Sequence, residues 1–267
     1  SALKVKEVGY VLSKDYWGRG LMPEAVAAVI RGIAQEKQAP FLHCADWPPS
    51  AVALSARGAR FTAGFPGLPA QEYEIRLPGA HQVDNAVTAL AALSLLPEDL
   101  RVSPEAARAG LRDAVWPGRL EWRGNLLLDG AHNPQGVRAL REYAQDFLRD
   151  RRVAVLTGSM ADKDVAAIAE GIAAIADAVV CVSPEHMARA VPAPELCALY
   201  RGRTDKPVLA AEDTAQGLRQ AQTLAGEAGV VLVCGSLYLV GEVRRMLESP
   251  EWDSREVETE CTFCSCP

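Results

Sequence analysis

The second half of the chain alternates short, continuous apolar runs with segments of helical periodicity. Residues 153–158, 178–182 and 230–234 are almost entirely apolar, and helical patterns run over 164–175 and 214–225. Apolar runs of this length without alternation are typical of strands buried on both faces, and helices between them specify a mostly parallel, doubly wound sheet. The same pattern adds a strand at 208–209 and helices at 194–200 and 237–247. We therefore predict an α/β fold, with residues 98–248 as one domain.

A strand, a polar turn and a helix follow one another at the start of this pattern. The apolar run Leu126–Leu128 ends at Asp129, and Pro134 opens a helix after His132 and Asn133. Ligands of open α/β sheets bind beyond the carboxyl ends of the strands, where a helix start offers backbone N–H groups to an anion. The three polar residues are therefore predicted to face a ligand such as a phosphate. The alternative is a strand-to-helix turn in which Asp and Asn only shape the backbone.

Composition and charge exclude several classes of protein. With 267 residues, of which 49% are hydrophobic, the chain has enough apolar content for a sizeable core. Its formal net charge of −6 gives no basic field for nucleic acid. No run of about eighteen apolar residues and no signal-peptide core is present, so we expect no membrane contact and a cytoplasmic location.

The turn Asp-Gly-Ala-His-Asn-Pro at residues 129–134 resembles the folylpolyglutamate synthase/dihydrofolate synthase family of the Mur ligase superfamily. The resemblance runs from about residue 24 to residue 248. Its further motifs are Gly-Ala-His-Gln-Val-Asp-Asn-Ala at 79–86, Trp-Pro-Gly-Arg-Leu-Glu at 116–121, Asp-Lys-Asp at 162–164 and Gly-Ser-Leu at 235–237. It implies a Rossmann-like carboxy-terminal ligase domain over 98–248, with residues 1–97 as a partial α/β remnant of the central ATPase domain.

The resemblance also implies roles for individual residues. Asn85, with His81 and Gln82 nearby, would lie at the adenine of ATP, or His81 and Gln82 would only satisfy the first turn of their helix. Arg119 would contact the ATP phosphates, since a guanidinium grips phosphate oxygens in pairs. Asp129 and His132 would also bind ATP, and His132 and Arg119 are the predicted catalytic residues.

Two further turns are expected at the same edge of the sheet. By the same resemblance, Lys163 and Ser236 could hold the incoming glutamate. The alternative is helix capping, for which Asp162 and Ser236 are suitable residues.

The family reaction is ATP-dependent addition of L-glutamate to a folate or dihydropteroate carboxylate through an acyl phosphate, with ATP and Mg²⁺ as cofactors. This sequence contains no Gly-x-x-x-x-Gly-Lys-Ser/Thr phosphate loop. The family's magnesium ligands also lie upstream of the matching region, so no metal site is predicted here. We therefore expect an incomplete ligase, which would need a missing half that carries the phosphate loop.

Residues 5–34 resemble a fragment of a GNAT acetyltransferase. A strand at 8–12 is followed by Gly18, Arg19 and Gly20, which stand where that family binds the coenzyme A pyrophosphate. A glycine-rich turn without a phosphate is the alternative. The competing functions are thus an acetyl-CoA-dependent N-acetyltransferase and a non-catalytic nucleotide-binding protein.

The remaining predictions concern hairpins and cysteines. Strands are expected at 51–54, 59–63 and 73–77, and helices from about 80 to 96 and from 103 to 114. Four cysteines lie in apolar surroundings and are predicted to be core residues: Cys44, Cys181, Cys197 and Cys234. Cys261, Cys264 and Cys266 fall in a polar segment, 249–267, that is expected to be a disordered tail.

Overall fold

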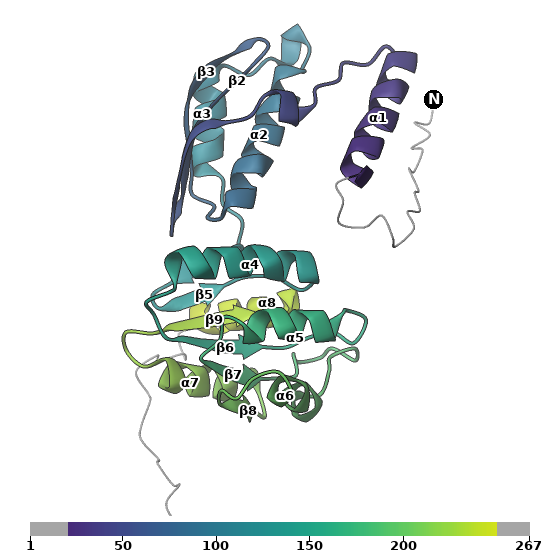
Figure 1. Ribbon diagram of the computed structural model, residues 1–267. Coiled ribbons are helices and arrows are strands. Elements are labelled where there is room, and N and C mark those ends of the chain that lie inside the picture. The colour runs from purple at the N-terminus through teal and green to yellow at the C-terminus, as the bar shows by residue number, and fades with distance from the viewer. Residues whose placement is uncertain (1–20, 250–267) are drawn as a thin grey trace, which may run out of the picture.

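The computed structural model describes residues 21–249, and their side chains from residue 27 onward. These residues form two sheets, of six and three strands, each with its own helices (Figure 1). The predicted strand at 8–12, the turn at Gly18 to Gly20 and the cysteines Cys261, Cys264 and Cys266 lie outside the described residues. Within residues 21–249, no helix has both the length and the apolar content of a membrane span.

The six-stranded sheet has the order β4-β5-β9-β6-β7-β8. Its strands are β4 (Glu121–Arg123), β5 (Leu126–Leu128), β6 (Val153–Thr157), β7 (Ala178–Cys181), β8 (Val208–Ala210) and β9 (Val230–Cys234). Neighbouring strands run parallel, except that β4 is antiparallel to β5. Because β9 lies between β5 and β6, the turns that follow these three strands meet at one edge. The predicted doubly wound, mostly parallel sheet is confirmed.

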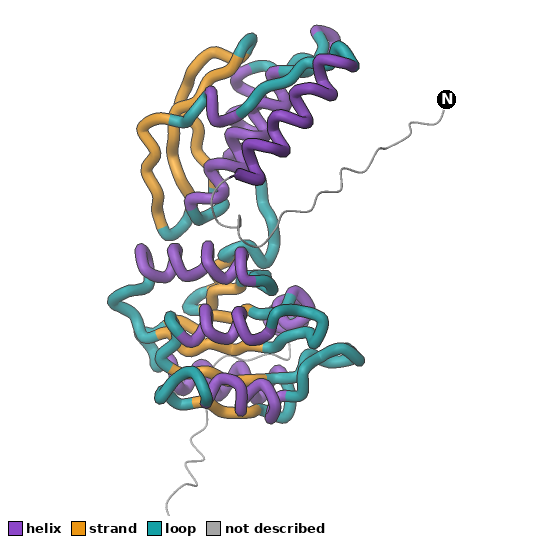
Figure 2. Tube along the Cα trace, turned by 45° about the vertical axis from the view of Figure 1, so that its right-hand side comes forward, coloured by secondary structure: helices purple, strands orange, loops and turns teal. Residues whose placement is uncertain are grey.

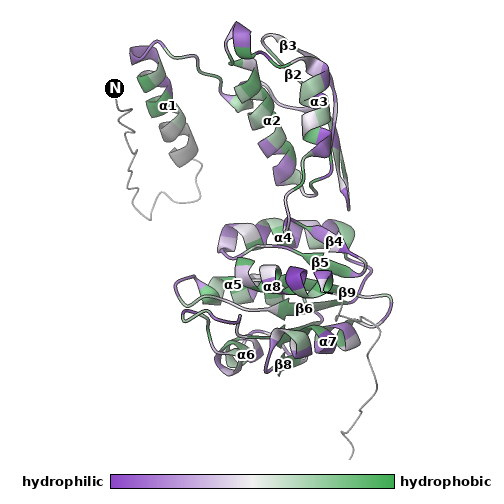
Figure 3. Cartoon of the chain, turned by 180° about the vertical axis from the view of Figure 1, so that it is seen from behind, coloured by the Kyte–Doolittle hydropathy of each residue, from purple (hydrophilic) through white to green (hydrophobic). Residues whose placement is uncertain are grey.

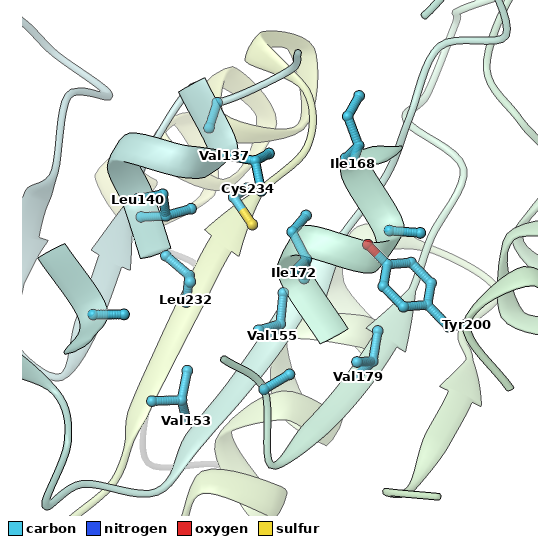
Figure 4. Packing of buried hydrophobic residues seen from close by; sticks show 14 of the residues in the cluster. Val137, Leu140, Val153, Val155, Ile168, Ile172, Val179, Tyr200, Leu232 and Cys234 are labelled. Carbon is cyan, nitrogen blue, oxygen red and sulfur yellow. The ribbon is translucent and has the colours of Figure 1, made fainter. Parts of the chain in front are cut away.

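Helices cover both faces of this sheet. The helices α4 (Pro134–Phe147), α5 (Val165–Ala173) and α6 (Ala193–Arg201) cover one face, and α7 (Thr214–Ala225) and α8 (Leu237–Glu248) cover the other. Successive strand residues point to opposite faces, so Val155 and Leu232 pack toward α4 to α6 (Figure 4) while Leu156 and Val233 pack toward α7 and α8. Both faces are apolar because both are covered.

The small sheet is antiparallel and has the order β1-β2-β3. Its strands are β1 (Ser50–Ser55), β2 (Gly58–Phe65) and β3 (Leu68–Ile75), and its helices are α2 (Ala80–Ser94) and α3 (Pro104–Asp113). Figure 2 shows the helices of this part lying on one side of its strands. Phe61, Tyr73 and Leu90 fill the core between them. Two short 3₁₀ helices, η2 (Cys44–Asp46) and η3 (Glu98–Leu100), complete this part. The three predicted hairpin strands are found close to their expected positions.

The packing of α3 differs from the expected domain organisation. Ala107 of α3 lies in the core of the small sheet, and Arg108 Nη2 donates to Gln71 Oε1 at 2.6 Å. From the sequence, a domain over residues 98–248 would include this helix. Since helix α3 has its apolar and polar contacts on β3, we propose that the domain boundary lies between Asp113 and Gly118.

Helix α1 (Leu21–Glu36) stands apart from α2 and α3, and Figure 3 shows apolar residues in the part of it that is coloured. Val29, Ile30 and Ile33 are between 43% and 50% exposed. The described chain therefore leaves an apolar helix surface uncovered.

Candidate functional site

The turn after β5 is organised by Asp129, which is only 9% exposed. Its Oδ2 accepts the Leu120 N–H at 3.0 Å, and its Oδ1 accepts the Ala131 N–H at 2.9 Å. Burial raises the pKa of this carboxyl, while the two backbone donors and the charge of Arg119 act in the opposite direction. The carboxylate thus ties the loop before β4 to the turn after β5.

Two glycines let these segments approach closely. Gly130 N donates to Gly118 O at 2.7 Å. Gly118 has a φ of +71°, and a Cβ there would lie 2.9 Å from Val240 Cγ1. The contact of the two backbones fixes the position of Arg119, whose side chain is exposed at the rim of the site.

Helix α4 begins with its own cap. Asn133 Oδ1 accepts the Gly136 N–H at 2.8 Å, Asn133 O accepts the Val137 N–H at 3.0 Å, and Pro134 has no N–H. The Gly136 N–H of the first turn is thus satisfied within the chain, and anion binding at this helix start stays a prediction.

His132 is turned back on its own turn. Its Nδ1 lies 2.8 Å from Gly130 O, and since a carbonyl oxygen only accepts, Nδ1 carries the proton. The side chain is partly buried. Its catalytic role stays a prediction.

The start of α2 brings a second set of polar groups. Asn85 Nδ2 donates to Gln82 Oε1 at 3.0 Å, and Gln82 Nε2 lies 3.1 Å from His81 Nε2. Burial lowers the pKa of His81, and the charge of Arg119 lowers it further against the opposing charges of Asp84 and Glu142. Gln82 is buried, so it connects the exposed Asn85 to the half-buried His81.

A cavity of about 220 Å³ lies where these pieces meet. It is lined by His81, Arg119, Leu120, Asp129, Ala131, Asn133, Gln135, Gly136, Ala139 and Leu140. His81 comes from the helix on the small sheet, and the other residues come from the loop before β4, the turn after β5 and helix α4. The structure thus brings the predicted residues Arg119 and Asp129 together, with His81, whereas Asn85 and His132 are not among the lining residues.

The two turns predicted to hold glutamate are occupied by local contacts. Lys163 Nζ pairs with Asp162 Oδ2 at 3.1 Å, and Asp162 also pairs with Arg189. Ser236 is 2% exposed, and its hydroxyl oxygen accepts the Tyr238 N–H to cap α8, as the capping alternative expects. The cap of α5 is Asp164, which accepts the Ala167 N–H, so the cap predicted at Asp162 is wrong. Glutamate binding by Lys163 and Ser236 stays a prediction.

The cavity does not fit a magnesium ion. Asp129 is its one acidic lining residue, and both of its carboxylate oxygens already accept backbone N–H groups. Within residues 21–249, no group of three or more His, Cys, Asp or Glu side chains is arranged to hold a metal.

Some residues of the site carry no sequence signal of their own. Gln135 and Ala139 line the cavity because they follow Asn133 on the exposed side of α4, and only the helical period after Pro134 could have located them. Trp122 and Tyr143, which both donate hydrogen bonds to Ala56 O in the turn between β1 and β2, occupy apolar patterns typical of ordinary core positions.

Comparison with known proteins agrees with this architecture. Residues 118–237 match the model of the Mur ligase glutamate ligase domain. The chain is 31% identical over 233 residues to the dihydrofolate synthase/folylpolyglutamate synthase of Bacillus subtilis. The aligned region covers 85% of this chain and 53% of that protein. The aligned region thus includes residues of both sheets.

Solved structures show the same relation. The folylpolyglutamate synthase of Thermotoga maritima superimposes with a TM-score of 0.70 at 26% identity, over 85% of this chain and 52% of that one. Escherichia coli FolC, solved in complex with DHPP and ADP, gives a TM-score of 0.65 at 26% identity, over 83% and 50%. These relatives lend no support to an acetyltransferase. Residues 118–237 are thus similar to the glutamate ligase domain of the Mur ligases, and the chain resembles the folylpolyglutamate and dihydrofolate synthases over about half of their length.

Proposed function

We propose that this chain supplies part of the ATP site and of the glutamate pocket of an ATP-dependent glutamate ligase acting on a folate or dihydropteroate carboxylate. The observation that carries the proposal is the cavity in which His81, Arg119 and Asp129 meet at the carboxyl edge of the sheet. A cationic guanidinium beside a histidine at this edge suits the phosphates of a nucleotide.

The reaction has two steps. A carboxylate oxygen of the acceptor attacks the γ-phosphorus of ATP, ADP leaves, and an acyl phosphate remains. The glutamate amine then attacks the acyl carbon, phosphate leaves, and the nitrogen loses a proton. We assign Arg119 to stabilising the negative charge of the phosphates. We assign His132, whose Nδ1 donates to Gly130 O, to proton transfer at its Nε2.

The same proposal requires that other parts of the site come from outside this chain. The 267 residues contain no Gly-x-x-x-x-Gly-Lys-Ser/Thr segment. We infer that the phosphate loop and the magnesium ligands come from another polypeptide segment, which completes the site against the cavity described above.

The first test is nucleotide binding by calorimetry with ADP. Replacing Arg119→Ala removes a charge-assisted contact, and such contacts contribute about 1.5–3 kcal/mol, so ADP affinity should fall roughly 10- to 100-fold. Arg203→Ala, which removes an exposed arginine that follows α6, is the matched control. An affinity for ADP that Arg119→Ala leaves unchanged would refute the assignment of Arg119.

Catalysis is tested by ADP release from ATP with L-glutamate and either dihydropteroate or tetrahydrofolate. Release that needs both substrates and is lost in His132→Ala supports a ligase that works without a recognisable phosphate loop. ADP binding without release favours the second candidate, a nucleotide-binding protein that does not catalyse, and the missing phosphate loop is the observation behind that candidate.

A further inference from the structure

The two sheets meet at a second place, away from the cavity. The turn between β1 and β2 presents the carbonyl oxygen of Ala56 to the six-stranded sheet. Tyr143 Oη donates to this oxygen at 2.8 Å, and Trp122 Nε1 donates to it at 3.2 Å. Trp122 Nε1 also lies 2.9 Å from Tyr143 Oη, so the three groups form a closed triangle, here called the Ala56 cluster.

Both side chains of the cluster are held rigidly on the large sheet. Trp122 belongs to β4, and Tyr143 is 2% exposed on α4, with its ring 5.1 Å from that of Phe147. The Arg57 guanidinium lies 5.1 Å from the centre of the Trp122 ring and that of Arg151 lies 5.7 Å from it. Arg57 belongs to the part of the chain with the small sheet, and Arg151 belongs to the part with the large sheet. The indole ring therefore has a cationic neighbour from each part.

Helix α4 connects this cluster to the cavity. Its first turn lines the cavity through Gln135 and Gly136, opposite His81 of α2. Tyr143 follows about two turns later, which is roughly 12 Å along the helix axis. A rigid helix that touches the small sheet at two separated points fixes the rotation of that sheet as well as its distance.

We propose that the Ala56 cluster holds the small sheet in the orientation in which His81 and Arg119 line one cavity. Trp122 and Tyr143 are thus positioning residues for the nucleotide, an inference that rests on the proposed ATP site. They act through the position of α2, because neither is among the residues that line the cavity.

The test replaces Tyr143→Phe, which removes the hydroxyl and keeps the buried ring. If the competent orientation then falls to roughly a tenth of the molecules, the apparent affinity for ADP falls about tenfold. Tyr200→Phe is the matched control, because Tyr200 is also a buried tyrosine in the core of the large sheet. It lies on α6, and among the described residues no hydrogen bond joins α6 to the small sheet. ADP binding that is equally tight in both variants would overturn the proposal.

A second measurement needs no nucleotide. The indole N–H of Trp122, assigned by its loss in Trp122→Phe, should exchange with water at least several-fold faster in Tyr143→Phe than in Tyr200→Phe. The radius of gyration from small-angle scattering should rise in Tyr143→Phe alone. If the wild type binds no ADP, the proposed function fails, and this measurement still decides the cluster: an unchanged radius and unchanged exchange refute it.

Discussion

Asp129 shows how one side chain can serve the backbone and the site together. It faces the cavity, yet both of its oxygens accept backbone N–H groups from Leu120 and Ala131. Without these donors, the desolvation cost of the buried carboxylate would not be offset by hydrogen bonds, and the folded chain would be destabilised. The residue therefore holds the backbone at Leu120, next to Arg119, against the turn after β5.

The raised pKa of Asp129 predicts a pH dependence of stability. The carboxyl of Asp129 binds its proton more tightly in the folded chain than in the unfolded chain. Its contribution to the free energy of unfolding therefore falls as the pH rises from 3.8, the ordinary pKa, through the raised pKa of the folded chain. Asp129→Asn lacks this dependence and places an amide donor against a backbone donor, at a cost of about 1–3 kcal/mol.

Urea unfolding between about pH 4 and about pH 7 measures this effect. The stability advantage of the wild type over Asp129→Asn should shrink as pH rises. Asp177→Asn is the control of opposite sign: burial opposes ionisation of Asp177, but the Val153 N–H and Lys206 hold its pKa below the ordinary value. Its wild-type advantage should grow with pH. A pH-independent difference for Asp129→Asn would contradict the prediction.

At the scale of elements, α4 is the helix that organises the site. Asn133 caps it, Pro134 opens it, and Val137 and Leu140 pack it on the large sheet. Its first turn faces α2, and Tyr143 near its end contacts the turn between β1 and β2. The position of the cavity therefore depends on where this helix begins.

Removing the cap should destabilise the chain without disturbing the sheet. Asn133→Ala deletes the acceptor of the Gly136 N–H, for an expected loss of about 1 kcal/mol in the free energy of unfolding, measured in urea without nucleotide. Asn133→Ser retains a capping oxygen and should recover most of that loss. If the serine variant is as unstable as the alanine variant, the cap is not the source of the stability.

At the scale of the whole molecule, two cores share one chain. The core of the large sheet lies on both of its faces, and the core of the small sheet lies between β2, β3, α2 and α3. Hydrogen bonds to Ala56 O join them, residues of both parts line the cavity, and no described hydrophobic cluster runs across. Such contacts add little cooperativity compared with a shared core.

Scanning calorimetry should therefore resolve two unfolding transitions. The small sheet buries less apolar surface and should unfold at the lower temperature. Hydrogen exchange should show weaker protection of the β2 and β3 amides than of the β6 and β9 amides. A single transition with equal calorimetric and van't Hoff enthalpies would refute this view.

The sequence by itself determined the doubly wound sheet, since continuous apolar runs at 153–158 and 230–234 are stable only when buried on both faces. Local chemistry also set the caps at Ser103 and Ser236. These features depend on neighbours within a few residues. The ligand roles of all the candidate site residues remain predictions: Asn85, Arg119, Asp129, His132, Lys163 and Ser236.

Only the tertiary structure decided which polar groups meet. His81 and Arg119 are separated by 38 positions in the chain and share a cavity because α2 lies against the start of α4. The triangle at Ala56 joins residues 66 and 87 positions apart. The packing of α3 on the small sheet is of the same kind. Each contact depends on how two rigid parts are oriented, and side-chain periodicity along one element carries no information about that orientation.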